Sequence, residues 1–143
     1  MSYYKVFRKE KPEPEKDEET GLRIITEKFC CKLCEYNGGY EYPHLNSNLY
    51  LNFQGFHKIE NLDNFINLRV LYLENNCIGK IEGLSKLTSL ACLYLQNNYI
   101  QEIEGLDNNK EIVILNLSGN KIKRIENMKN LQFLRRKKLH FDC

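Results

Sequence analysis

Hydrophobic and polar positions repeat along this chain with a period of 22 residues from residue 49 onwards. Each unit opens with Leu-x-Leu, an alternation that predicts a short strand whose two leucines lie on one face. Isoleucine followed by glutamate occupies the eleventh and twelfth places of every unit, and further apolar residues follow at the fourteenth and twentieth places. The units begin at Leu49, Leu71, Leu93 and Leu115.

An amide side chain recurs at the sixth place, where the chain turns off the strand. An amide carries both hydrogen-bond donors and an acceptor, so it can satisfy backbone groups that such a turn leaves unpaired. We therefore predict a structural ladder of asparagines inside the repeats. Its members are Asn76, Asn98 and Asn120, with Gln54 at the same place of the first unit.

These repeats predict an α/β repeat fold, a leucine-rich-repeat solenoid. One coil of this size cannot cover its own apolar surface, so neighbouring coils must stack. We expect four repeats over residues 49–136, with short parallel strands on the concave face and 3₁₀ or extended return limbs. A bundle of amphipathic helices would instead need apolar spacing near 3.6 residues, and it would not place asparagine in phase.

The segment before the repeats predicts a cap. Thr26 can cap a helix whose apolar face would cover the first coil, and Asn37-Gly38-Gly39 ends that helix. We expect this cap helix and a linker over residues 21–48. Residues 1–20 combine charge and proline with little apolar surface, which predicts a disordered charged tail.

The segment after the repeats is ambiguous. Only Leu139 fits the opening of a fifth unit, so residues 137–143 are expected to be an incomplete fifth repeat or a frayed basic tail. The basic run 135–138 is compatible with a nuclear-localisation or nucleic-acid patch, or with a solvated terminus.

Composition adds few restrictions. A net charge of +2 gives no reason to expect nucleic acid, and no apolar run approaches the length needed to span a bilayer. The first residues show no apolar core of a signal peptide, so we expect a cytoplasmic protein with six reduced cysteines. Cys31 and Cys34 are not followed by a second close pair of metal ligands. We expect no metal, no cofactor, no catalytic site and a monomer.

Strand alternation predicts which side chains point away from the core, and these form the candidate partner-binding face. Three tyrosines in register make an aromatic ladder with polar neighbours, a combination that protein interfaces favour. Cross-strand packing of the tyrosines for stability alone is the alternative. The glutamates of the Ile-Glu places form a second candidate stripe or a merely solvated edge. The predicted face comprises Tyr50, Tyr72, Glu74, Tyr94, Gln96 and Asn116.

The sequence also resembles a known family. The run Gly55-Phe56-His57-Lys58-Ile59-Glu60-Asn61-Leu62, the helix ending in Leu33-Cys34 and the Tyr42-Pro43 linker are similar to the axonemal dynein assembly factor 1 family. The resemblance covers about residues 24–134. It implies a cytosolic, cilium-related protein that helps to preassemble axonemal dynein arms, with dynein subunits and chaperones as partners.

Two other functions are compatible with the same repeat class. The Ile-Glu-Asn/Gly-Leu tetrad also resembles the 22-residue repeats of a protein-phosphatase regulatory subunit. A spliceosomal particle protein of the A-prime type uses capped repeats of this length as well, and it would give the basic run at 135–138 a role. All three alternatives are protein-binding scaffolds rather than enzymes.

Overall fold

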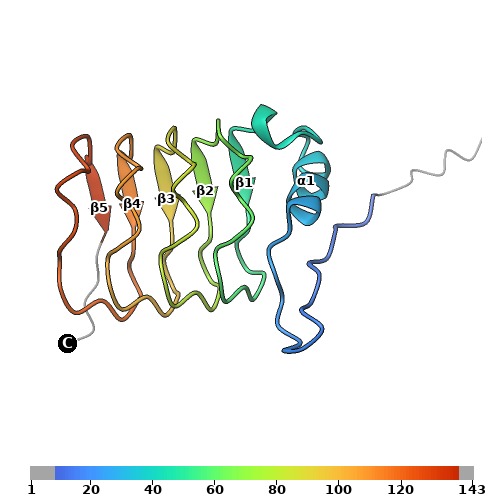
Figure 1. Cartoon of the computed structure of the whole chain (residues 1–143), viewed down its shortest axis with the longest axis horizontal. Helices are drawn as coiled ribbons and strands as arrows, with labels where there is room; N and C mark the ends of the chain where they lie inside the picture. Colours follow the sequence, from blue (N-terminus) through green and yellow to red (C-terminus); the bar gives the residue numbers. More distant parts are fainter. Residues whose placement is uncertain (1–8, 139–143) are drawn as a thin grey trace, which may run out of the picture.

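A single parallel sheet runs through the molecule from one end to the other. The computed structural model describes residues 9–138. In this range the sheet has five strands in the order β1-β2-β3-β4-β5, one from each coil (Figure 1). The elements are α1 (Glu27–Tyr36), the 3₁₀ turn η1 (Pro43–Leu45), β1 (Asn48–Tyr50), β2 (Val70–Tyr72), β3 (Cys92–Tyr94), β4 (Ile114–Asn116) and β5 (Arg136–Lys138).

Each strand pairs with the next at the same place of the repeat. Leu49 is paired with Leu71, Leu71 with Leu93, and Leu93 with Leu115. The middle leucine of each of these four strands is buried, as are the apolar places of the return limbs, so the stacked coils share one core. The predicted leucine-rich-repeat solenoid is therefore confirmed.

The return limbs are extended and contain turns instead of α-helices. In the second coil Leu87 N–H donates to Leu84 O (3.0 Å), and Leu90 N–H donates to Leu87 O (3.2 Å). Two successive turns of this 3₁₀ type carry the chain back over the core, within the range of conformations that the short period predicts. Asn61, Gly83, Gly105 and Asn127 all have φ between 58° and 69° at the thirteenth place. A Cβ atom at Gly83 would lie 2.5 Å from Ile59 O, so glycine allows these two coils to stack more closely than a side chain would without a local shift.

The asparagines of the sixth place lie inside the coil and bond to its backbone. Asn98 Oδ1 accepts from Ile78 N–H (3.0 Å), and Asn98 Nδ2 donates to Leu73 O and Leu95 O (both 3.0 Å). Asn76 and Asn120 make equivalent bonds to their own and the preceding coil. Each amide therefore joins two coils at the turn, in addition to the bonds of the sheet.

Asn109 has a similar role on the return limb. It replaces a leucine or phenylalanine of the seventeenth place, which made it a polar break in the pattern. The side chain is fully buried, and its Nδ2 donates to Leu84 O (2.9 Å) and Leu87 O (3.0 Å) of the preceding coil. Its Oδ1 has no hydrogen-bond partner among the described residues. A polar residue is thus tolerated at this apolar place because two carbonyl groups of the preceding coil accept hydrogen bonds from it.

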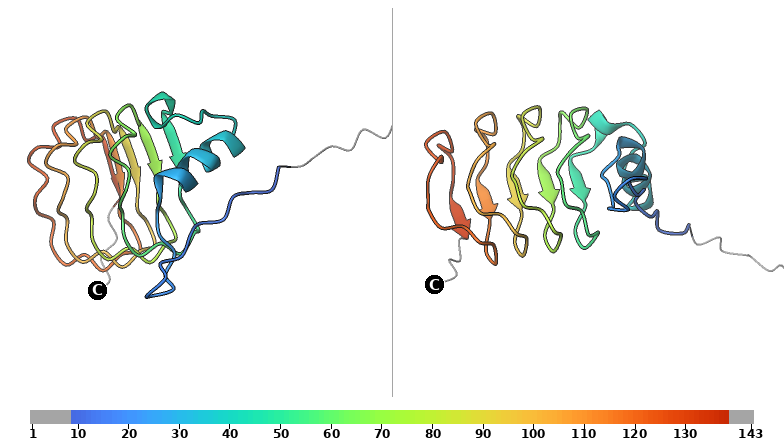
Figure 2. Two further views of the ribbon diagram at one scale, coloured as in Figure 1. Left: turned by 45° about the vertical axis from the view of Figure 1, so that its right-hand side comes forward. Right: turned by 60° about the horizontal axis from the view of Figure 1, so that its bottom comes forward.

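Helix α1 covers the first coil at the end of the solenoid opposite β5, as the two views in Figure 2 show. Thr26 Oγ1 accepts from Phe29 N–H (3.1 Å), which is the cap expected from the sequence. Phe29 meets Phe56 of the first coil edge to face, with ring centroids 6.0 Å apart. The apolar face of the helix is Phe29, Cys30, Leu33 and Cys34, all buried.

The structure differs from the predicted disordered tail over residues 15–20, which form a small hairpin with residues 21–24. Lys16 forms an antiparallel bridge with Arg23, and Ile24 N–H donates to Glu15 O (3.0 Å). Asp17 Oδ1 accepts from the backbone N–H (2.7 Å) and the hydroxyl (2.8 Å) of Thr20, and it closes the turn of this small hairpin. Composition missed this because the hairpin is held by backbone and turn hydrogen bonds, with few apolar side chains. Residues 1–8 of the predicted tail lie outside the described residues.

At the other end, β5 adds a fifth strand to the sheet. Lys137 stands in register with Leu115, so the strand pairs without the leucine that opens the other units. A parallel ladder needs only backbone groups. The pattern of side chains therefore could not decide whether this segment forms a strand. Residues 139–143 of the predicted incomplete repeat or basic tail lie outside the described residues.

The cap cysteines are buried thiols. Burial, with the nearby Cys34 and Cys31, raises the pKa of Cys30, and burial raises the pKa of Cys34 to about 11. Among the described residues no group of three or more His, Cys, Asp or Glu side chains could hold a metal ion.

We predict that Asn98→Leu destabilises the fold by about 1–3 kcal/mol, because it leaves turn backbone groups of two coils unpaired. The matched control is Gln96→Leu, two residues earlier on the outer side of the sheet, where no turn backbone depends on the side chain. Its effect should stay within about 0.5 kcal/mol. Chemical denaturation of both variants measures the difference, and equal midpoints would refute the structural role of the ladder.

We predict that Cys30 and Cys34 react slowly with a thiol reagent in the folded protein at pH 8, because a raised pKa keeps both in the unreactive thiol form. All six thiols should react once the protein is denatured without reductant, and a chelator should leave the melting temperature unchanged. Because folding raises both pKa values above the ordinary thiol value of 9.0, the folded state favours the protonated thiols. The free energy of unfolding should therefore keep its full value below about pH 9 and should fall as the pH rises through the folded pKa values. Stoichiometric zinc in the purified protein would contradict this interpretation.

Candidate protein-binding surface

The outward side of the parallel sheet is the candidate surface, and we call it the sheet face. In β2, β3 and β4 the residues on either side of the buried leucine are half-buried, as alternation requires. Ladder bonds continue past the strands: Asn75 N–H donates to Gln96 O, and Asn97 N–H donates to Ser118 O. The fourth places therefore share this face with the tyrosines. All six residues predicted to bind a partner lie on the sheet face.

The three tyrosines form one continuous stack across β1, β2 and β3. The ring centroids of Tyr50 and Tyr72 are 4.7 Å apart with planes at 9°, and those of Tyr72 and Tyr94 are 5.0 Å apart with planes at 5°. Burial raises the pKa of Tyr72, and the tyrosines on either side add to this effect. The side chains therefore both pack across strands and present their ring edges to solvent. Cross-strand packing of the tyrosines is therefore compatible with their proposed role in binding a partner.

The stack ends at β4, where Asn116 takes the place of a tyrosine. Its Oδ1 accepts from the N–H (3.2 Å) and the hydroxyl (2.8 Å) of Ser118, so this amide is bound within its own coil. Among the described residues, the Tyr94 ring therefore has no aromatic neighbour on its β4 side.

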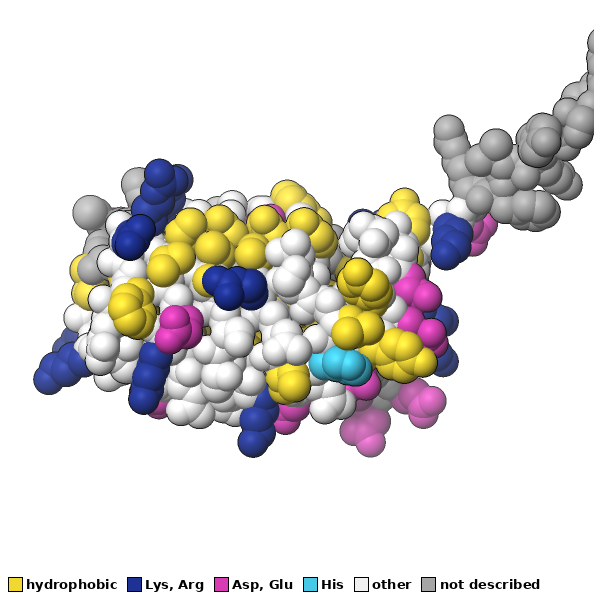
Figure 3. Space-filling view, turned by 90° about the horizontal axis from the view of Figure 1, so that it is seen from above, with side chains coloured by type: hydrophobic (Ala, Val, Ile, Leu, Met, Phe, Trp, Pro, Cys, Tyr) yellow, Lys and Arg dark blue, Asp and Glu magenta, His cyan; other side chains and the backbone are white. Residues whose placement is uncertain are grey.

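Polar and apolar rows flank the tyrosines. Glu74 Oε2 and Gln96 Oε1 are buried and have no hydrogen-bond partner among the described residues. On the other flank, Val70, Cys92 and Ile114 stand in register at the start of the strands. Figure 3 looks onto this end of the repeats and shows hydrophobic side chains in a row across them. The sheet face thus combines an apolar row, an aromatic row and a row of hydrogen-bond acceptors.

The cap extends this surface beyond β1. A cavity of about 200 Å³ lies between the end of α1 and β1, beside the exposed Tyr50. Tyr40 and Leu45 line it, and they are 59% and 50% exposed. Sequence analysis missed this hollow, since it arises only when η1 folds back between the helix and the sheet. In the sequence, the tyrosines of the linker are the one feature that could have indicated this hollow.

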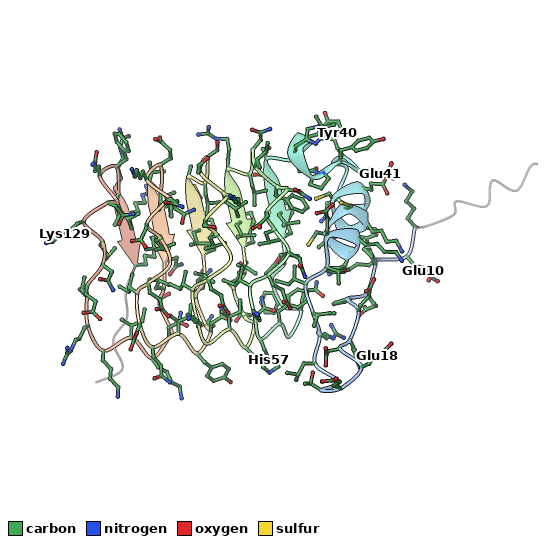
Figure 4. The ribbon with its side chains drawn as sticks, in the orientation of Figure 1. Glu10, Glu18, Tyr40, Glu41, His57 and Lys129 are labelled. Carbon is green, nitrogen blue, oxygen red and sulfur yellow. The ribbon has the colours of Figure 1, made fainter. Side chains whose placement is uncertain are left out.

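The other candidate features lie elsewhere. Glu60 and Glu82 of the Ile-Glu stripe are half-buried on the return side of the coils, and Glu60 pairs with Lys58 at 3.9 Å. His57, close to this stripe in the sequence, lies at the opposite end of the coils from Tyr40 (Figure 4). The basic run contributes Arg136 and Lys138 to β5, where both are exposed. Among the described residues, no helix has the length and apolar character needed to cross a membrane.

Comparison with known proteins identifies the repeats. A family described as leucine-rich repeats (2 copies) matches residues 66–108. A dynein axonemal assembly factor 1 homolog of Drosophila pseudoobscura pseudoobscura is 50% identical over 63 residues, which is 44% of this chain and 4% of that protein. Dynein axonemal assembly factor 1 of Mus musculus is 46% identical over 39% of this chain and 9% of its own length.

A third curated relative comes from a green alga. Leucine-rich repeat-containing protein ODA7 of Chlamydomonas reinhardtii is 39% identical over 54 residues, which is 38% of this chain and 12% of that protein. The similarity therefore spans at most about an eighth of the length of these three relatives.

Solved structures support the fold. Internalin C2 of Listeria monocytogenes superimposes with a TM-score of 0.65 at 22% identity, covering 83% of this chain and 47% of that one. An internalin (InlF) of the same organism gives a TM-score of 0.59 at 23% identity, covering 78% and 31%. At this level of identity the likeness concerns the fold alone. The chain has a leucine-rich-repeat fold, its residues 66–108 match the leucine-rich-repeat family, and about two fifths of its length is similar to dynein axonemal assembly factor 1.

Proposed function

We propose that this chain is a non-catalytic protein-binding scaffold that acts in the cytoplasmic preassembly of axonemal dynein arms, and that its partner lies on the sheet face. The partners would be axonemal dynein subunits and the chaperones that handle them. The observation that carries the proposal is the 39–50% identity of this region to relatives named as dynein axonemal assembly factors or ODA7.

The geometry supports the choice of surface. The sheet face is continuous over all five coils and is built on backbone that adjacent coils hold in register. Rigid aromatic side chains lose little conformational freedom on binding, because the stack already restricts them. Tyr72 and Tyr94 lie at its centre, where interface energy is usually concentrated.

We predict that Tyr72→Ala combined with Tyr94→Ala abolishes partner capture. Central aromatic side chains that become fully desolvated often contribute about 2 kcal/mol or more each to binding. The same change removes the ring stack, so we also expect it to lower the stability of the fold by about 1–3 kcal/mol. Capture from ciliated-cell extract measures the first effect, at a temperature where circular dichroism shows the variant to be folded.

Two controls separate binding from general damage. Tyr72→Phe combined with Tyr94→Phe keeps the stacked rings and should retain most of the capture. Glu60→Ala combined with Glu82→Ala alters the return side and should keep both capture and melting temperature. If the tyrosine-to-alanine variant captures normally while the glutamate variant does not, the partner binds the Ile-Glu stripe and the proposed surface is wrong.

The identity of the captured proteins tests the cellular role. Mass spectrometry should find axonemal dynein chains and chaperones, and it should lose them in the tyrosine-to-alanine variant. A phosphatase catalytic subunit in their place would favour the regulatory-subunit alternative. Splicing proteins would favour the spliceosomal alternative, and either result would overturn the proposed role in dynein assembly.

A further inference from the structure

Charge is distributed unevenly along the solenoid. Residues 113–138 hold eight Lys or Arg residues and the single acidic residue Glu126, whereas carboxylates outnumber basic side chains over residues 9–112. In Figure 3, Asp and Glu side chains are concentrated around the α1 end, where Lys and Arg side chains are also present, whereas mainly Lys and Arg side chains appear at the β5 end. The overall charge of +2 conceals this separation.

Two of the basic side chains belong to the sheet face itself. Arg136 is paired in register with Ile114, and Lys138 is paired with Asn116, so both continue the rows of the face onto β5. Both side chains are exposed. Neither forms an ion pair with another residue of the described range 9–138. The sheet face therefore changes from aromatic and apolar over β2 and β3 to cationic over β5, with the small Ser118 and the bound Asn116 between them.

We propose that the occupant of the sheet face is a protein segment with an apolar anchor residue and acidic residues beyond it. The anchor lies against Tyr72 and Tyr94, and the carboxylates meet Arg136 and Lys138. This inference rests on the proposed function for its site and adds the chemistry and direction of the partner. Opposite charge guides such a segment into one orientation across the strands.

The spacing of the strands fixes the spacing in the partner. Neighbouring strands lie about 4.8 Å apart, so β3 and β5 are separated by about 10 Å and β2 and β5 by about 14 Å. An extended chain rises about 3.3 Å per residue. The first carboxylate therefore belongs three or four residues from the anchor.

The tyrosine stack favours a protein over a nucleic acid. Single-stranded nucleic acids bind by stacking bases on free aromatic faces beside a basic groove. Here both ring faces of Tyr72 are covered by its neighbours at 4.7 Å and 5.0 Å, and the β4 side of Tyr94 lies at the end of the stack, so the tyrosines offer no row of free faces to successive bases. The ring edges that remain exposed suit an aliphatic or aromatic side chain, and Glu74 beside them repels phosphate.

The test uses the full chain and labelled synthetic peptides of 14 residues in a Gly/Ser background. One peptide carries a leucine with two glutamates beginning four residues away, the second has lysines in place of the glutamates, and the third places the glutamates eight residues away. Fluorescence anisotropy should show the first peptide binding at least about tenfold more tightly than either other peptide. Amide chemical shifts should change along β2 to β5.

Charge exchange supplies the matched variants. Arg136→Glu combined with Lys138→Glu should lower the affinity for the glutamate peptide about tenfold, and this variant should bind the lysine peptide more tightly than the glutamate peptide. Lys123→Glu combined with Arg124→Glu makes the same change of net charge in the preceding coil, away from the sheet, and it should leave the preference for glutamate unchanged. Circular dichroism confirms that both variants are folded.

Several results would overturn the proposal. These are equal weakening by the two charge variants, no dependence on the position of the glutamates, no binding of the first peptide at 1 mM, or tighter binding of a 14-nucleotide RNA. If any of these occurs while Tyr72→Ala with Tyr94→Ala still loses partner capture, the proposed binding surface stands and only the acidic chemistry fails. If the charge exchange behaves as expected but the tyrosine variant captures normally, the proposed surface fails instead.

Discussion

The whole structure depends on the stacking of coils that cannot bury their own apolar surface. Each coil offers a few leucines and isoleucines to the next one, and the parallel ladder keeps equal places in contact. The asparagines add hydrogen bonds from one side chain to the backbone of two coils. Apolar contact therefore drives the assembly, while the amides hold each turn at one fixed height relative to its neighbour.

This register also shapes the outer surface. Because Tyr50, Tyr72 and Tyr94 occupy the same place of three coils, the stacking of the core brings their rings together. The aromatic ladder is therefore a consequence of the core, because the stacking of the coils already orders the tyrosine side chains. A surface of this kind is prepared for binding, since its side chains need not become ordered when a partner arrives.

The same repetition leaves the ends of the solenoid different from its middle. At one end α1 supplies the apolar contacts that a preceding coil would have made, and Asn61 Nδ2 bonds to Ile25 O in front of the helix (2.8 Å). At the other end, Ile125 and Phe133 of the last coil are 51% and 52% exposed, although the equivalent Ile103 is buried. The same stretch of the chain, residues 113–138, carries eight Lys or Arg residues and one glutamate. The two ends therefore differ in both polarity and charge, which gives the sheet face a direction.

The sequence by itself determined the solenoid, its period, the cap helix and the side chains that point outward. These follow from a pattern in which each place has one physical task, so repeated copies reinforce one another. It did not reveal that residues 15–24 form a hairpin, since backbone hydrogen bonds around Asp17 leave little trace in composition. It also could not show that Asn109 joins two coils or that the linker folds into a cavity beside Tyr50. Only the tertiary structure decided these features, because each depends on groups from separate coils or elements whose contacts no local pattern records.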